Sequence, residues 1–145
     1  MLKKIDHVNV VVSDLDKARE FFTQLGFLVG DESELEGEWI SEIVGLKDVK
    51  ARYVTLTLPD STAKLELIEY SSPPSDKDPK IGMANQMGFR HIAFEVKDIE
   101  TTVQNMKNNG IEFIGPIQTY PKTGKRLVYF RGPDGILLEL AQYHK

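Results

Sequence analysis

Apolar and polar residues alternate along HVNVVVSD, which begins at His7, and the apolar spacing then lengthens in LDKAREFFTQLGF. A two-residue period is typical of a strand with one buried face, and a period of about 3.6 residues is typical of an amphipathic helix. The stretch HIAFEVKDIETTVQNMKNNGI, which begins at His91, changes period in the same way. The pattern therefore predicts a strand followed by a helix at both places.

The two stretches are copies of one unit. They align without a gap from Asp6 and Arg90, at the constant offset that separates His7 from His91. In each copy an aspartate stands where it can cap the helix, and a glycine follows the last turn. Other aligned pairs are Asp14 with Asp98, Leu15 with Ile99, Gly26 with Gly110 and Phe27 with Ile111. An internal repeat of this kind predicts two modules of the same fold.

The two modules also end alike. PDSTAKLELIEY from Pro59 resembles PDGILLELAQYH from Pro133 once the turns are allowed to differ by one residue, which sets Glu66 opposite Glu139. The preceding segments ARYVTLTL and RLVYF are rich in β-branched and aromatic residues and are predicted to be strands. The predicted fold class is α+β, with two tandem βαβββ modules that form a curved mixed sheet around a central trough.

The predicted organisation is a single domain over residues 1–145. It consists of a first module at 1–70, a linker at 71–88 and a second module at 89–145. The linker, SSPPSDKDPKIGMANQMG, is polar and contains prolines, as connecting segments do.

The first module differs from the second by an insertion, ESELEGEWISEIVGLKDV. In this segment Trp39, Ile40, Ile43 and Val44 follow a helical spacing. We expect a short helix over one end of the first sheet, with Trp39 in the core beneath it.

Strand alternation places four polar residues on the sheet faces that point away from the predicted helices. The valines that alternate with His7 would face the first helix, so His7 points away from it, and the same holds for His91 in the second copy. The leucines that flank Glu66 and Glu139 are natural partners for the helices. Both glutamates are therefore predicted on the helix-free faces, together with the two histidines.

These four residues form the candidate site. If the two helix-free faces line one trough, the repeat brings His7, Glu66, His91 and Glu139 to its centre. The chain has no cysteine, and two imidazoles with two carboxylates suit one divalent ion such as Zn, Ni, Co, Mn or Fe. Each residue alone has a simpler interpretation as a strand-end histidine or a solvated glutamate. The coincidence of all four on one repeat favours the metal.

Five other residues are secondary candidates. Lys122, Lys125 and Arg126 lie in YPKTGKRL, where they could bind a substrate anion, although a solvated loop is the simpler interpretation. Asn9 and Glu95 share the strand faces of the histidines and could support a ligand or move a proton.

Charge and composition restrict the partners. The chain has 18 basic and 22 acidic residues, a net charge of −4 and no basic cluster, which argues against nucleic acid. It has no apolar run long enough to span a bilayer and no signal peptide at its start, so we expect a cytoplasmic protein without a membrane partner. We expect a small-molecule substrate and a homodimer, because sheets of this kind present long edges that need covering.

Four stretches, DHVNVVVSDLDKAREFFTQLGF, KLELIEY, FRHIAFEVKDIETTVQNMKNNGI and YFRGPDGILLEL, resemble the vicinal oxygen chelate superfamily. This superfamily contains glyoxalase I, methylmalonyl-CoA epimerase, extradiol dioxygenases, and the fosfomycin- and bleomycin-resistance proteins. The resemblance covers essentially the whole chain and is closest in pattern to glyoxalase I. It implies that His7, Glu66, His91 and Glu139 are the metal ligands. It also implies that Glu139 and Glu66 are catalytic and remove a proton next to a carbonyl to give a metal-stabilised enediolate.

The members of the superfamily differ in ways that this sequence can partly separate. The epimerase usually has Gln where Glu66 stands and a further upstream Glu, where GLKDVKA offers only Asp48. Extradiol dioxygenases and fosfomycin-resistance enzymes use three protein ligands. The resemblance therefore implies a glyoxalase-like isomerase or lyase, of the lactoylglutathione lyase type, that acts on a small α-oxo or vicinal-oxygen substrate. The alternatives are a metal-free protein that sequesters a small molecule, as bleomycin-resistance proteins do, and an epimerase-like racemase.

Overall fold

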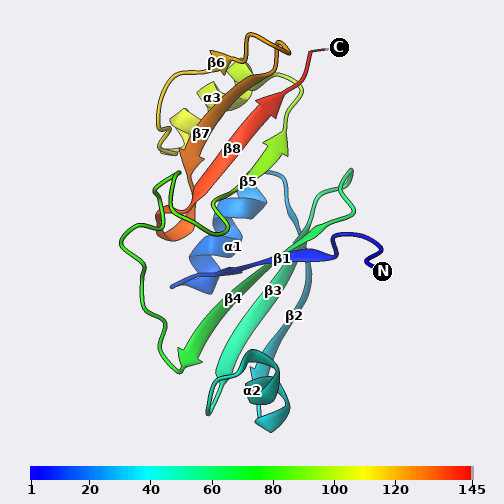
Figure 1. Ribbon diagram of the computed structural model, residues 1–145, viewed down its shortest axis with the longest axis vertical. Coiled ribbons are helices and arrows are strands. Elements are labelled where there is room, and N and C mark those ends of the chain that lie inside the picture. Colours follow the sequence, from blue (N-terminus) through cyan, green and yellow to red (C-terminus); the bar gives the residue numbers. More distant parts are fainter. Residues whose placement is uncertain (145) are drawn as a thin grey trace. The chain divides into compact units, whose positions relative to one another are not determined.

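The structure is a computed structural model that describes residues 1–144. Its chain divides into two compact units, Met1–Asp76 and a second that begins at Lys77. Each unit contains a four-stranded sheet and a long helix, and the first unit has an additional short helix (Figure 1). The fold class is α+β with two tandem modules, as the repeat predicts.

The first unit is built on a mixed sheet with the strand order β1-β4-β3-β2. Strand β1 is parallel to β4, and the other neighbours are antiparallel. Its elements are β1 (His7–Val11), α1 (Leu15–Gln24), β2 (Leu28–Glu36), α2 (Glu38–Val44), β3 (Lys50–Thr57) and β4 (Lys64–Ser72).

The second unit repeats this topology with the strand order β5-β8-β7-β6. Strand β5 is parallel to β8, and the others are antiparallel. Its elements are β5 (His91–Glu95), α3 (Ile99–Asn108), β6 (Gln118–Thr119), β7 (Arg126–Arg131), the 3-10 turn η1 (Pro133–Gly135) and β8 (Leu137–Gln142).

The second strand of the repeat is much shorter in the second unit. Strand β2 has nine residues, whereas β6 has two. Upstream of β6, Phe113 forms only an isolated bridge with Phe130. The segment between them contains Pro116, which has no N–H to donate to a sheet. The sequence therefore predicts this strand in the right place in the chain order but not its reduced length.

Both long helices begin and end as the sequence predicts. The Asp14 side chain accepts a hydrogen bond from the backbone N–H of Lys17 at 3.0 Å, and Asp98 accepts one from Thr101 at 3.1 Å. Gly26 and Gly110 follow the helices with φ of 107° and 82°, a left-handed conformation that favours glycine. In the described residues 1–144, no helix is long and apolar enough to cross a membrane.

Strand register confirms the pairing of the two glutamates. Glu66 on β4 lies beside Asn9 on β1, and Glu139 on β8 lies beside Ala93 on β5. Asn9 and Ala93 occupy the same position of the repeat, because each lies two residues after its histidine. Glu66 and Glu139 are therefore equivalent residues in the two sheets.

The cores lie between each sheet and its long helix. Helix α1 contacts β3 and β4, and α3 contacts β8. The leucines that flank each glutamate are buried, as expected for residues that face a helix. The buried residues on the helices are Leu15, Ala18 and Phe22 on α1, and Ile99, Val103 and Met106 on α3. This arrangement leaves the glutamates on the faces opposite the long helices, although in the first sheet α2 packs on part of that face, over Ala51 and Ile68.

The insertion contains the short helix α2, as predicted, but its residues 32–36 belong to β2, and the helix does not bury its tryptophan. Ile40 packs in a small cluster with Val49, Ala51 and Ile68. Trp39 is 58% exposed, and its indole N–H donates to the carbonyl of Glu36 at 3.0 Å. The prediction of Trp39 as core is therefore wrong, because a helix of seven residues presents one narrow stripe to the sheet and Ile40 occupies it.

Candidate functional site

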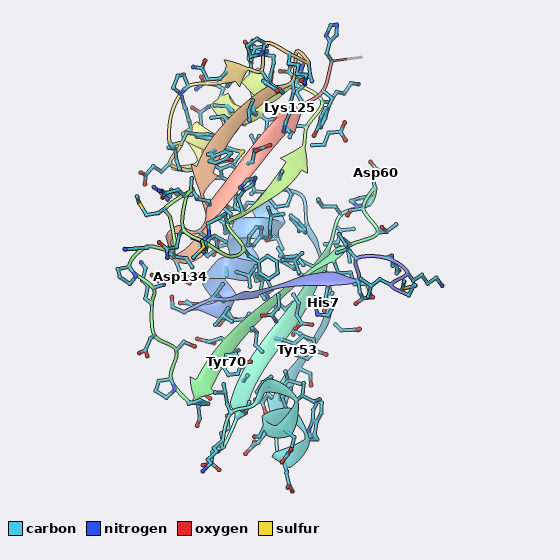
Figure 2. All side chains as sticks on the ribbon, viewed as in Figure 1. His7, Tyr53, Asp60, Tyr70, Lys125 and Asp134 are labelled. Atoms are coloured by element: carbon cyan, nitrogen blue, oxygen red, sulfur yellow. The ribbon has the colours of Figure 1, made fainter. Side chains whose placement is uncertain are left out.

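The first pair of candidate ligands consists of His7 and Glu66 in the first unit. His7 begins β1 (Figure 2). Glu66 lies on the parallel neighbour β4. The His7 Nε2 and Glu66 Oε2 atoms are 3.8 Å apart, and the two side chains are 44% and 26% exposed. Parallel pairing thus brings the histidine and the glutamate together at a face that solvent can reach.

Two polar neighbours orient the first pair. His7 Nδ1 lies 2.8 Å from Asp6 Oδ2, and this contact holds the pKa of the Asp6 carboxyl below its ordinary value. With the proton on Nδ1, the His7 ring donates to Asp6 and presents the lone pair of Nε2 toward Glu66. The Asn9 amide donates to Glu66 Oε1 at 2.8 Å. Such contacts are typical of residues that orient metal ligands, and the contact with Glu66 fits the supporting role considered for Asn9.

The second pair consists of His91 and Glu139 in the second unit. The His91 Nε2 and Glu139 Oε1 atoms are 3.4 Å apart. The ring of His91 lies against that of Tyr129, with centroids 4.8 Å apart, and Tyr129 is the β7 residue directly opposite Glu139. Glu139 is only 4% exposed and is the single buried charged residue in the described part of the chain. The second pair is thus more enclosed than the first.

Lys125 supplies the charge that compensates Glu139. Lys125 lies in the second unit (Figure 2). Its Nζ lies 3.1 Å from Glu139 Oε2 and also lies over the ring of Tyr143, 5.5 Å from the centroid. The contact with Glu139 raises the pKa of the Lys125 ammonium above its ordinary value, against the opposing effect of burial. The contact is an ion pair without good hydrogen-bond alignment, because Glu139 Oε2 has no hydrogen-bond partner. The interpretation of Lys125 as a solvated loop residue is therefore wrong.

A signal for Lys125 was present in the sequence. Lys125 lies an even number of residues before Tyr129, and Tyr129 faces the same side of the sheet as Glu139. Extending the strand alternation of RLVYF by one residue would have placed the lysine on the face of the glutamate.

The other secondary candidates lie away from these contacts. Arg126 donates from Nη2 to Glu100 Oε1 on α3 at 2.7 Å, which directs it toward the helix side of the sheet. Lys122 and Glu95 are exposed. Neither has a described contact with the first or the second pair.

The donor atoms of both pairs fit a divalent ion. An ion with ligand distances of about 2.1 Å holds two neighbouring donors roughly 3.0–3.5 Å apart. The separation of 3.4 Å in the second pair lies in that range, and 3.8 Å in the first pair is slightly longer. Within residues 1–144, no three His, Asp or Glu side chains form a metal-holding group. Each pair lies in one unit, and the convergence of the two pairs on one ion remains a prediction.

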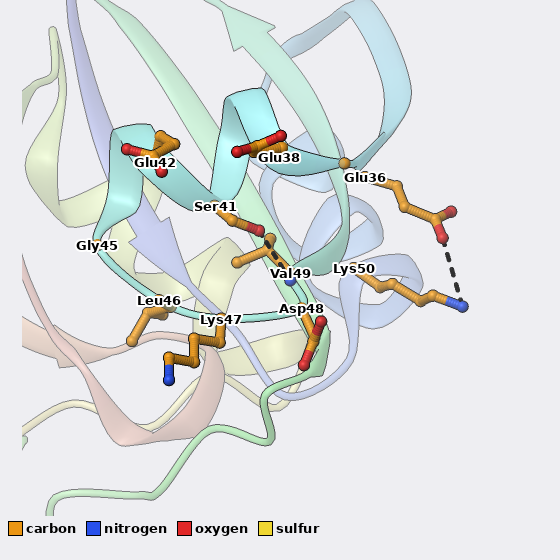
Figure 3. Close-up of a pocket in the computed structure, with 11 residues that line it drawn as sticks. Glu36, Glu38, Ser41, Glu42, Gly45, Leu46, Lys47, Asp48, Val49 and Lys50 are labelled. Carbon is orange, nitrogen blue, oxygen red and sulfur yellow. Dashed lines mark hydrogen bonds and ion pairs between the residues drawn. The ribbon is translucent and has the colours of Figure 1, made fainter.

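A separate cavity of about 590 Å³ lies beside α2 in the first unit (Figure 3). Its lining includes Glu36, Ser41, Asp48 and Lys50, and Lys50 Nζ pairs with Glu36 Oε1 at 3.4 Å. Ser41 Oγ accepts a hydrogen bond from the Val49 N–H at 3.1 Å, which fixes the return from the helix to β3. The cavity contains neither His7 nor Glu66, so it belongs to the insertion rather than to the candidate site.

Comparison with known proteins gives consistent matches over nearly the whole chain. Residues 4–140 match the family model described as the Glyoxalase/Bleomycin resistance protein/Dioxygenase superfamily. The crystal structure of a glyoxalase family protein from Bacillus cereus superimposes with a TM-score of 0.91 at 31% identity, covering 100% of this chain and 97% of that chain.

Two curated relatives match at similar levels. The uncharacterized protein YwkD of Bacillus subtilis is 32% identical over 97% of this chain and 97% of its own length. The 2-epi-5-epi-valiolone epimerase of an Actinomyces species is 28% identical over 94% of this chain and 77% of its own length.

Proposed function

Because the chain belongs to the Glyoxalase/Bleomycin resistance protein/Dioxygenase superfamily, we propose that it is a metal-dependent isomerase or lyase of the glyoxalase type. The proposed substrate is a small molecule with an α-oxo group or two vicinal oxygens. Members of the superfamily include enzymes and commonly use divalent metal ions. The observation that carries the proposal is the occurrence of one histidine–glutamate pair at the same repeat positions in both units.

The residues proposed to hold the ion are His7, Glu66, His91 and Glu139. Each pair lies on the face of its sheet opposite the long helix, and its donor atoms have a spacing close to that of neighbouring ligands. The two carboxylates would balance a charge of +2, which suits a divalent cation. When bound, the ion would act as a Lewis acid toward adjacent oxygen atoms of a substrate. Zn, Ni, Co, Mn and Fe all accept such a donor set.

Glu66 and Glu139 are the proposed catalytic bases. A base must reach the carbon next to the carbonyl, accept its proton and return it to the neighbouring position. Glu66 suits this movement because only Oε1 is held by the Asn9 amide, and the side chain is 26% exposed. Glu139 would act from a buried position, where its carboxylate is held between His91 and Lys125. Asn9 would orient Glu66 by fixing one of its two oxygens.

An epimerase is the second candidate function. The relative from Actinomyces carries that name and matches 94% of this chain. Epimerisation and glyoxalase-type isomerisation both begin with removal of a proton next to a carbonyl, so the same glutamates could serve either reaction. The two reactions differ in the product: an epimerase returns the proton to the same carbon on its other face. Proton NMR of candidate 2-oxo and vicinal diol substrates in D₂O would separate them by the position of the deuterium.

Metal content and metal titration test the proposal. Purified protein, loaded with each candidate ion, should bind one equivalent and convert methylglyoxal in the presence of a thiol or exchange a proton of another α-oxo compound. Glu66→Gln and Glu139→Gln should each lose metal affinity by about a hundredfold or more, since each removes a charged ligand. Glu95→Gln is the matched control, because it removes an exposed carboxylate of β5 outside both pairs.

A protein that binds none of these ions under any loading condition would contradict the proposal. In that case the metal-free sequestering protein becomes the better explanation. Its expected signature is a small-molecule affinity that Glu66→Ala and Glu139→Ala leave nearly unchanged.

A further inference from the structure

Glu139 has a cationic partner from its own chain. Its carboxylate is buried, and burial of a charge is costly unless an opposite charge or several donors compensate it. Within the second unit, His91 lies 3.4 Å from one oxygen and Lys125 Nζ lies 3.1 Å from the other. Lys125 and His91 thus contact different oxygens of the Glu139 carboxylate.

Among residues 1–144, no lysine or arginine forms a described ion pair with the equivalent glutamate, Glu66. Glu66 lies opposite Thr55 on β3, as Glu139 lies opposite Tyr129 on β7. Four residues before these partners stand Ala51 in the first unit and Lys125 in the second. Ala51 is buried in the cluster beneath α2, and Glu66 receives a neutral amide from Asn9 instead. The lysine is therefore specific to one half of the repeat.

The backbone around Lys125 is held, whereas its side chain has a path to solvent. The Lys125 carbonyl accepts from the N–H of Tyr120 at 2.7 Å, and its N–H donates to Thr123 Oγ1 at 3.3 Å. The side chain is 24% exposed and lies along the ring of Tyr143. The ammonium group can therefore leave Glu139 by rotation of the side chain, without rearrangement of the turn.

We propose that Lys125 is a displaceable counter-cation that neutralises Glu139 in the metal-free protein and competes with the metal ion for that carboxylate. The inference rests on the proposed function, because it takes Glu139 as a metal ligand. An ammonium group beside one oxygen of a ligand carboxylate repels a cation that approaches the other oxygen. Metal binding is therefore weaker while Lys125 stays in place, and it is favoured when Lys125 moves toward solvent. Lys125 would thereby keep the buried carboxylate paired without metal, and it would lower the affinity for weakly bound ions. It is a positioning residue, since it acts through Glu139.

Substitution of Lys125 by a neutral residue tests whether its charge competes with the metal ion for Glu139. Lys125→Gln retains a donor beside Glu139 but removes the positive charge, and so makes the second pair resemble the first. Titration of the full-length protein with Co²⁺ by calorimetry should give a dissociation constant about tenfold lower for this variant, because a charge at this distance shifts such equilibria by roughly 1–3 log units. Lys125→Arg keeps the charge and should bind Co²⁺ within about threefold of the unmodified protein. Lys122→Gln, which removes a charge from the same loop without contacting Glu139, should not change the affinity.

Thermal unfolding provides a readout that a purely structural role would not reproduce. Without metal, Lys125→Gln should unfold at a lower temperature than the unmodified protein, because Glu139 loses its counter-charge. With saturating Co²⁺ the difference should vanish or reverse, since the ion then compensates the carboxylate. A purely structural lysine would lower the unfolding temperature equally in both conditions.

The outcomes separate this inference from the proposed function. Tighter Co²⁺ binding by Lys125→Gln, together with a loss of stability only in the metal-free protein, supports the inference. Equal or weaker binding by that variant, while the unmodified protein binds Co²⁺, overturns it and leaves the proposed function intact. If Lys125→Gln does not fold without metal, it is refolded in the presence of Co²⁺. Recovery of the folded protein supports the inference that the ion can replace Lys125 as the counter-charge of Glu139, and failure to recover it overturns the inference. If the unmodified protein binds no metal, the proposed function fails and the inference fails with it.

Discussion

The two histidine–glutamate pairs share one backbone geometry and differ in their surroundings. In the first pair Glu66 is partly exposed and accepts from the Asn9 amide, while His7 is held by the Asp6 carboxylate. In the second pair Glu139 is buried between His91 and the Lys125 ammonium, and His91 lies on Tyr129. The first pair thus has an additional negative charge beside it, on Asp6, and the second pair has a positive charge beside it, on Lys125. Duplication repeated the strand positions, but the side chains around them set different electrostatic conditions.

This contrast indicates that the two pairs would interact differently with an approaching cation. A cation approaching the first pair meets the carboxylates of Asp6 and Glu66 on an exposed face, which favours its capture. A cation approaching the second pair meets the positive charge of Lys125 beside Glu139, which opposes its binding until Lys125 moves away. The following predictions test how far the two halves differ.

The largest expected difference is in stability without metal. Glu139→Ala leaves Lys125 without its partner and creates a cavity next to Tyr129, so we expect a loss of about 2 kcal/mol in the free energy of unfolding. This is less than for a fully buried pair, because Lys125 can turn toward solvent. Glu66→Ala, on the exposed face, should cost less than about 1 kcal/mol. Urea denaturation of the metal-free variants measures both, and equal losses would contradict the contrast between a buried and an exposed pair.

A smaller effect, on metal affinity, is expected from the residue that holds the Glu66 carboxylate in place. Asn9→Ala removes the amide that holds Glu66 Oε1, so we expect the affinity for Co²⁺ to fall by about tenfold, at the lower end of the usual range for such supporting residues. Ala93→Ser provides a matched control, since Ala93 occupies the same position of the repeat beside Glu139. Calorimetric titration should show little change for the control. An unchanged affinity of Asn9→Ala would remove Asn9 from the site.

The smallest expected effect is on stability at alkaline pH. The pKa of Lys125 is raised in the folded protein above its ordinary value of 10.5. Its contribution is therefore fully present below that value and is lost as the pH rises through the higher folded pKa. We expect the stability difference between the unmodified protein and Lys125→Gln, under about 1 kcal/mol at about pH 8, to shrink at alkaline pH. Urea denaturation across this range would reveal it, and a difference that grows with pH would show the sign to be wrong.

Much of the architecture could be predicted because its signals are local. The change of period at Asp14 and Asp98 marks the helix starts, and each aspartate caps its helix as expected. The reduced length of β6 is less predictable, because it depends on which residues of the preceding segment find a partner on β7. The exposure of Trp39 is another such case, since the apolar spacing of α2 does not say which of its side chains meets the sheet.

The sequence by itself determined the repeat, the helix ends and the face of each strand on which His7, Glu66, His91 and Glu139 lie. These follow from periodicity and from the backbone conformations that aspartate and glycine favour. Only the tertiary structure decided that Glu139 is buried, that Glu66 is partly exposed, and that Lys125 rather than an amide compensates the buried carboxylate. Periodicity assigns a side chain to a face but not its depth or its partners, which depend on the register between strands and on the reach of long side chains.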